Sequence, residues 1–274
     1  MTVIPRDQTR DRRIEDPTNR WLVHPLAHAL LPWAIRSGVS ANAVSIIGLG
    51  LGLIAALCFA RFHVPGFATL GLLFAALWLV ADGLDGMIAR ATGTASPLGR
   101  ALDGLCDHGV FFIIYVSVAL AISTPMGWVL AVAAGCAHAV QSNLYEAERT
   151  RFHRRLRGDP GEVAPDRTRL PLERLYDFVT ALSDRSAARF DRALAASPDR
   201  LAAGRRYAEA AIPAMRLLAL ETANARIMLL WLACMGGAPT LFFWAELGPL
   251  TLIAVTGILL HRRAEAAAID QELA

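Results

Sequence analysis

Four aspartates stand close together in an otherwise apolar part of this chain. Asp82 and Asp85 follow one uncharged run, and Asp103 and Asp107 precede another. Ionisable side chains in such places are costly and are candidates for function. Four carboxylates in one cleft of low dielectric constant repel one another unless some protonate or a cation binds between them. The pattern therefore predicts one or two divalent cations, and oxygen ligands favour Mg²⁺, Mn²⁺ or Ca²⁺ over zinc.

Helical spacing predicts that the two acidic pairs face each other. At about 100° per residue, each pair falls on one stripe of its helix. The stripes also carry small residues and one cation, namely Gly86, Ala89 and Arg90 on the first helix and Gly99 on the second. The glycines leave room for a ligand, and Arg90 is placed to pair with a phosphate. We expect an eight-residue loop, 91–98, to join the helices as antiparallel neighbours.

The helices that position these residues must be membrane spans. The 274 residues are 55% hydrophobic and 19% charged, with a mean hydropathy of +0.41, and the charge is segregated along the chain. A hydrocarbon core of about 30 Å needs about 20 helical residues. The uncharged runs predict an all-α integral membrane protein with six transmembrane helices, at roughly 41–60, 66–90, 99–122, 127–146, 214–236 and 240–261.

The arginines predict the orientation of these spans. Every basic residue counted as Lys or Arg is an arginine, and all but Arg61 and Arg226 fall on one side of the six spans. Because positive charge marks the cytoplasmic side, we expect both termini, the aspartates and the segment 147–213 to be cytoplasmic in a protein of the cytoplasmic membrane. The net charge of +3 is too small to indicate a nucleic-acid partner.

Two segments outside the spans have helical patterns. Within residues 1–40, Trp21, Leu22, Leu26, Leu30 and Trp33 recur at helical spacing and predict an interfacial amphipathic helix. Residues 147–213 are read as a cytoplasmic helical insertion between the fourth and fifth helices. The chain is thus divided into 1–40, 41–146 with the motif at 82–107, 147–213, and 214–274. Gly48 and Gly52 in the first span are spaced for close helix packing.

The acidic motif resembles the signature of the CDP-alcohol phosphotransferase family. The matching pattern is Asp82-x2-Asp85-Gly86-x2-Ala89-Arg90-x8-Gly99-x3-Asp103-x3-Asp107. The resemblance implies an enzyme that takes a CDP-linked donor and a hydroxyl acceptor and releases CMP. It also implies Mg²⁺ or Mn²⁺ as cofactor, one or two ions, and a homodimer embedded among membrane lipids.

The resemblance also implies roles for single residues. Asp82, Asp85, Asp103 and Asp107 would be metal ligands, with Asp107 also the general base on the acceptor hydroxyl. The CDP moiety would lie against Gly86, Ala89, Arg90 and Gly99. The start of the first span resembles the family's Pro-Asn-x-x-Thr pattern, with Ala41 in place of Pro and Ser45 in place of Thr. Asn42 is accordingly a candidate for the donor pocket.

Arg226 is the basic residue predicted to lie inside a span. Such an arginine faces the protein interior or a water-filled cavity. It could bind a phosphate or carboxylate of the acceptor, or it could form a structural bridge with Glu221. The sequence leaves both roles open.

The leading hypothesis is a transferase of phospholipid synthesis that uses CDP-diacylglycerol and a small acceptor such as an inositol or glycerol phosphate. An alternative within the class uses CDP-ethanolamine or CDP-choline and a lipid hydroxyl. Two other classes are a divalent-cation transporter and a metal-dependent prenyl transferase. A transporter is expected to distribute carboxylates across the bilayer, whereas here the four aspartates share one face. Prenyl transfer does not require glycine, alanine and arginine at fixed positions beside the aspartates.

Overall fold

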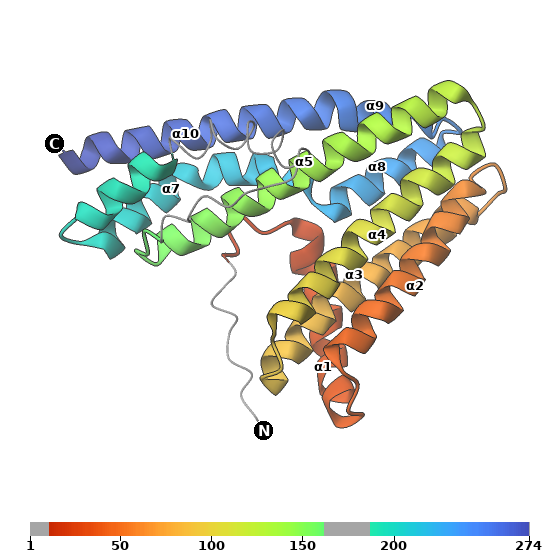
Figure 1. Cartoon of the computed structure of the whole chain (residues 1–274), viewed down its shortest axis with the longest axis horizontal. Coiled ribbons are helices and arrows are strands. Elements are labelled where there is room, and N and C mark those ends of the chain that lie inside the picture. The colour runs from red at the N-terminus through yellow and green to blue at the C-terminus, as the bar shows by residue number, and fades with distance from the viewer. Residues whose placement is uncertain (1–10, 162–186, 274) are drawn as a thin grey trace. The chain divides into compact units, whose positions relative to one another are not determined.

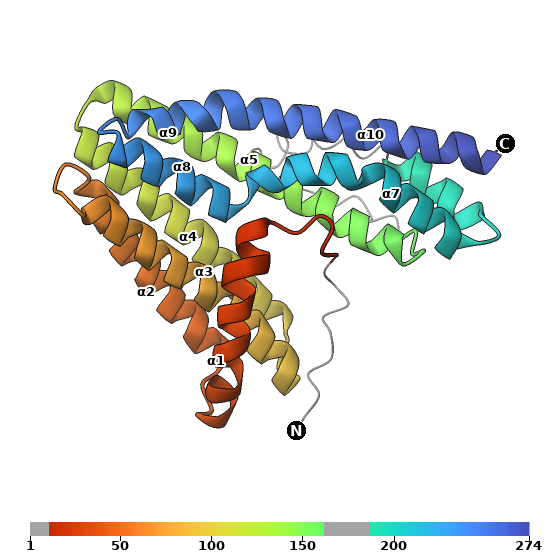
Figure 2. The same ribbon diagram turned by 180° about the vertical axis from the view of Figure 1, so that it is seen from behind.

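The computed structural model describes residues 11–161 and 187–273, and these residues form helices and no strand. The chain divides into two compact units (Figures 1 and 2). Of the described residues, the first unit contains 16–139 and 222–249, and the second contains 11–15, 140–161, 187–221 and 250–273. The all-α prediction is confirmed over the described residues.

The first unit is built around three long apolar helices. These are α2 (Ala41–Ala60), α3 (Phe67–Thr92) and α4 (Pro97–Ile122), and α2 packs against both others (Figure 1). The helix α8 (Ala223–Met235) packs on α3. Each of the three long helices contains a stretch apolar enough to cross a membrane.

Glycines bring the helices of the first unit close together, as their spacing predicts. A Cβ atom built on Gly48 would lie 3.4 Å from Trp78 Cδ1 of α3. On Gly52, a Cβ would lie 2.6 Å from Val110 Cγ1 of α4, closer than real side chains approach. The lack of a side chain at Gly52 therefore sets the distance between α2 and α4, since packed interiors have no spare volume.

A short turn joins α3 to α4. Gly93 ends α3 in the left-handed conformation with φ 68°, which glycine adopts without steric cost. The Ser96 hydroxyl accepts a hydrogen bond from the Gly99 backbone N–H at 3.0 Å and caps α4. The predicted eight-residue loop at 91–98 is therefore too long, because both helices extend into it and leave only residues 93–96.

The N-terminal segment forms a helix with two different faces. A π-helical turn, η1 (Asn19–Val23), continues into α1 (His24–Arg36), which packs on α3. Its buried residues are Val23, Ala27, Leu31 and Ala34. The apolar stripe singled out in the sequence lies on the other, exposed side, with Trp21 73% and Trp33 59% exposed. An apolar exposed face is what an interfacial helix needs, and its position at a membrane surface stays a prediction.

The second unit contains helices that run further than the predicted spans. The helix α5 (Pro125–Leu156) begins in the first unit and continues past residue 146 into the second. There, α7 (Arg200–Leu218) packs along α10 (Thr251–Leu273). Residues 187–196 are also helical. Residues 162–186 of the predicted 147–213 insertion lie outside the described residues.

Four helices of the described chain are long and apolar enough to cross a membrane, and a bent pair raises the number to five. This shows an integral membrane protein and leaves the six-span arrangement a prediction. The fifth span, predicted as one helix at 214–236, is interrupted, because the short helix η2 (Ala219–Glu221) follows α7 and α8 begins only at Ala223. The last span comprises α9 (Thr240–Ala245), the π-helix η3 (Glu246–Leu250) and α10.

The packing of α2 on α4 can be tested at Gly52. We expect Gly52→Ala to lower the free energy of unfolding by about 1–3 kcal/mol, because the new methyl group overlaps the Val110 side chain. The double variant Gly52→Ala/Val110→Ala should recover part of this loss. Thermal unfolding of the purified protein in detergent measures both, and Gly50→Ala, where a Cβ meets nothing within 4 Å, is the matched control. Equal stability of Gly52→Ala and Gly50→Ala would contradict the close approach.

Candidate active site

Three of the four aspartates meet at one end of α3 and α4. One carboxylate oxygen from each of Asp82, Asp85 and Asp103 lies within 4.8 Å of the other two. Asp85 is buried, and the other two are half-buried. Three oxygens this close together could hold one divalent cation, and binding would also remove the repulsion between them. The two acidic stripes thus face each other, as their spacing predicts.

Asp107 adjoins this group without belonging to it. It lies one helical turn after Asp103, and its side chain is in hydrogen-bonding contact with Asp82 and with the indole of Trp78. Asp107 thus contacts one member of the three-carboxylate group, and its role as a metal ligand stays a prediction. This arrangement leaves Asp107 beside the ligand group, where a base could accept a proton.

The first turns of α2 supply polar groups to the same site. The Ser45 hydroxyl donates a hydrogen bond of 2.5 Å to Asp85 Oδ2, and both residues are buried. A Cβ atom on Gly99 would lie 3.6 Å from Asn42 Oδ1. The Asn42 side chain therefore lies beside Gly99, which is predicted to contact the CDP moiety. The sequence identified Asn42 as a candidate but noted Ser45 only as a departure from a pattern. Its position one turn after Asn42 on the same helix face was the signal that could have identified it.

The residues predicted to bind the CDP moiety lie at one end of α3 and α4. A Cβ atom on Gly86 would lie 3.2 Å from Arg90 Nη1, so the Arg90 side chain folds back over Gly86. Arg90 is exposed, whereas Gly86, Ala89 and Gly99 are half-buried. A cation lying next to the carboxylate group, on an accessible surface, could pair with a phosphate. Their contact with CDP stays a prediction.

Arg226 lies in a different, fully enclosed cluster of the first unit. Its guanidinium forms an ion pair with Glu246, and its Nη1 lies 3.0 Å from His138 Nδ1. The Tyr115 hydroxyl donates to Glu246 Oε1 at 2.8 Å. Arg226 and Glu246 are both 0% exposed. This ion pair joins α8 to the start of η3, and the predicted bridge between Arg226 and Glu221 stays a prediction. A contact of Arg226 with the acceptor stays a prediction.

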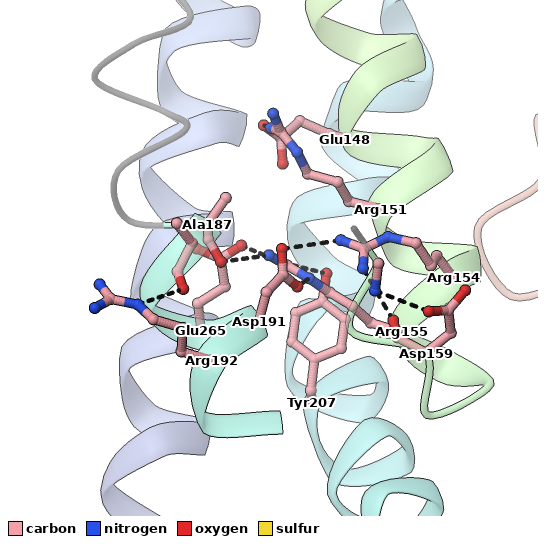
Figure 3. A network of polar contacts seen from close by, with 12 residues as sticks. Glu148, Arg151, Arg154, Arg155, Asp159, Ala187, Asp191, Arg192, Tyr207 and Glu265 are labelled. Atoms are coloured by element: carbon pink, nitrogen blue, oxygen red, sulfur yellow. Dashed lines mark hydrogen bonds and ion pairs between the residues drawn. The ribbon is translucent and has the colours of Figure 1, made fainter. Parts of the chain in front are cut away.

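The second unit holds a larger polar network centred on Arg155 (Figure 3). Arg155 Nε pairs with Asp191 Oδ1 at 2.7 Å, and Nη2 donates to the Ala187 carbonyl at 2.9 Å. The same guanidinium pairs with Glu265 of α10. Burial lowers the pKa of Arg155, but its neighbours Tyr207, Asp191 and Glu265 outweigh this and raise the pKa above its ordinary value. The network therefore fixes α5 to α10 and to the helix at 187–196.

A second group of potential metal ligands lies within this network. Glu148, His261 and Glu265 are buried and bring ligand atoms within 4.8 Å of one another. Glu148 pairs with Arg151 at 2.7 Å and also with Arg262, which in turn pairs with Glu265. Burial raises the pKa of Glu148, but the hydrogen bond with His261 and the charge of Arg262 hold it well below its ordinary value. Arginines already compensate these carboxylates, so the charge does not call for a metal.

Comparison with known proteins identifies the segment that carries the site. Residues 39–153 match the family described as CDP-alcohol phosphatidyltransferase. A phosphatidylinositol phosphate synthase of Cutibacterium acnes is 34% identical over 117 residues, which cover 42% of this chain and 53% of the relative. A second phosphatidylinositol phosphate synthase, from Mycobacteroides abscessus, is 39% identical over 92 residues, covering 32% and 36%. A CDP-diacylglycerol–serine O-phosphatidyltransferase of Mycobacterium leprae is 32% identical over 99 residues, covering 35% and 32%. The chain thus spans about half or less of these curated relatives.

The role of Arg226 can be separated into structure and acceptor binding. We expect Arg226→Met to cost about 3–5 kcal/mol of folding free energy, because it leaves the buried Glu246 carboxylate without this ion pair. The double variant Arg226→Met/Glu246→Leu should be more stable than Arg226→Met alone. Thermal unfolding in detergent measures both. Unchanged stability of Arg226→Met with a raised KM for the acceptor would instead assign Arg226 to acceptor binding.

Proposed function

We propose that this chain, which carries a CDP-alcohol phosphatidyltransferase domain in residues 39–153, transfers a phosphatidyl group from CDP-diacylglycerol to a hydroxyl acceptor and releases CMP. The observation that carries the proposal is the three-carboxylate group with Asp107 beside it. The name of one relative includes CDP-diacylglycerol, and two relatives are named for phosphatidylinositol phosphate. We take a small phosphorylated acceptor, such as an inositol or glycerol phosphate, as the first candidate.

The proposed chemistry follows from the charges of the site. Asp82, Asp85 and Asp103 would hold Mg²⁺ or Mn²⁺, one or two ions. A divalent cation, when bound, neutralises negative charge on the diphosphate. Arg90, beside Gly86, would pair with a phosphate oxygen, and Asn42 and Gly99 would line the donor pocket. These residues orient the diphosphate so that one phosphorus faces the acceptor.

Asp107 would act as the general base in the transfer step. The acceptor oxygen forms a bond to the phosphorus that carries diacylglycerol, and its proton passes to the Asp107 carboxylate. The bond between this phosphorus and the bridging oxygen breaks, and the bridging oxygen leaves with CMP. A base near the acceptor hydroxyl contributes typically 10²–10⁴-fold to such steps.

The proposed placement in the membrane brings a soluble nucleotide and a lipid together. In this proposal six helices span the cytoplasmic membrane, and both termini and the aspartates face the cytoplasm. The η1–α1 segment would lie at the headgroup level, with Trp21 and Trp33 as interfacial anchors, because their exposed rings suit that layer. The working form would be a homodimer among membrane lipids.

The substrates can be assigned by measuring CMP release. We expect release from CDP-diacylglycerol with Mg²⁺ or Mn²⁺ and one acceptor from a panel of inositol phosphate, glycerol phosphate, inositol and serine. Release only from CDP-choline or CDP-ethanolamine with diacylglycerol would select the alternative within the class. If no CDP-linked donor yields CMP from folded protein, the transferase assignment fails.

The role of Asp107 can be separated from that of the metal ligands. We expect Asp107→Asn to lower kcat by about 10²–10⁴-fold while Mn²⁺ binding, measured by electron paramagnetic resonance, stays within a few-fold of wild type. The matched variant Asp85→Asn should lose both activity and Mn²⁺ binding. Substantial turnover by Asp107→Asn would contradict the general-base assignment.

A further inference from the structure

The Ser45–Asp85 hydrogen bond is the contact between α2 and the carboxylate group. The Ser45 hydroxyl lies 2.5 Å from Asp85 Oδ2 and 3.3 Å from the Ala41 carbonyl oxygen. A hydroxyl has one proton to donate, and a carboxylate at the shorter distance is the stronger acceptor. The Ser45 proton therefore points to Asp85. Both side chains are buried, Ser45 at 7% and Asp85 at 4% exposure, so water has little access to this bond.

The place of Ser45 is set by the packing of α2 on α3 and α4. One turn further along α2, Gly48 lies against Trp78, where a Cβ atom would be 3.4 Å from Cδ1. One turn before Ser45, the Asn42 side chain lies beside Gly99. These two contacts restrain the backbone of α2 on both sides of Ser45. The hydrogen bond of Ser45 then directs Asp85 Oδ2 within the three-carboxylate group.

We propose that Ser45 is a positioning residue, which orients Asp85 so that the three-carboxylate group is preformed for a divalent cation. The inference rests on the proposed function for the identity of the cation site. Groups that hydrogen-bond a ligating carboxylate fix its direction, and their loss costs about 10–100-fold in metal affinity or activity. Ser45 therefore acts on cation affinity through Asp85 and does not contact the donor or the acceptor.

Four variants of the full-length protein in detergent test this role. Ser45→Ala removes the hydroxyl, whereas Ser45→Thr and Ser45→Val have the same shape and differ in the hydroxyl alone. The matched control is Ser117→Ala, a buried serine on α4 about 15 Å along the helix from Asp107. The measurements are Mn²⁺ affinity by electron paramagnetic resonance without substrates, the Mg²⁺ dependence of CMP release, and the thermal unfolding midpoint.

We expect Ser45→Ala and Ser45→Val to bind Mn²⁺ about tenfold more weakly, while Ser45→Thr and Ser117→Ala stay within about twofold of wild type. The Mg²⁺ concentration for half-maximal rate should rise in the same variants, with kcat nearly restored at saturating Mg²⁺. Equal Mn²⁺ affinity of Ser45→Thr and Ser45→Val would overturn the proposal, even if both unfold at a lower temperature. If no donor yields CMP but Mn²⁺ affinity still depends on the hydroxyl, Ser45 keeps its role and the proposed transferase function falls.

Discussion

Repulsion between carboxylates is the constraint on which the first unit depends. Three oxygens within 4.8 Å of one another would drive α3 and α4 apart if the helices could move freely. Packing opposes this movement, because α2 lies against both helices and Gly48 and Gly52 allow it to approach closely. The apolar contacts thus stabilise an arrangement that the charges alone would not favour.

In the two other polar clusters, buried carboxylates are paired with arginines. Arg226 pairs with Glu246, and Arg155 pairs with Asp191 and Glu265, so each cluster compensates its charge with protein groups. Such clusters fix the relative positions of helices, and removing one partner is far more costly than replacing the pair. The aspartate group consists mainly of like charges. The contrast between carboxylates paired with arginine and a group of neighbouring aspartates separates these two clusters from the candidate site.

The grouping of the aspartates was predicted from the sequence more accurately than the course of the helices. Asp82 and Asp85 are three residues apart and so share one face of α3, and a short connection between antiparallel helices was enough to predict Asp103 beside them. The interruption at Ala219–Glu221 was not predicted, because alanine, leucine and glutamate all favour a continuous helix. The ion pair of Arg226 with Glu246 was not predicted either. Glu246 lies 20 residues away in sequence, after the turn between α8 and α9, and only the fold brings the two together. The contact of Ser45 with Asp85 could likewise not be predicted, because it depends on how α2 packs on α3.

The turn between α3 and α4 limits how this protein can change in evolution. Surface loops usually tolerate insertions, yet residues 93–96 connect two helices whose carboxylates must meet. Gly93 and the Ser96 cap fix both helix ends, so an added residue would shift or rotate Asp103 relative to Asp85. A rotation of about 100° per residue in a helix would turn Asp103 away from its partners. A change in the length of this turn is therefore expected to disturb the site as directly as a change of one aspartate, although the exposed residues of the turn take no part in the chemistry.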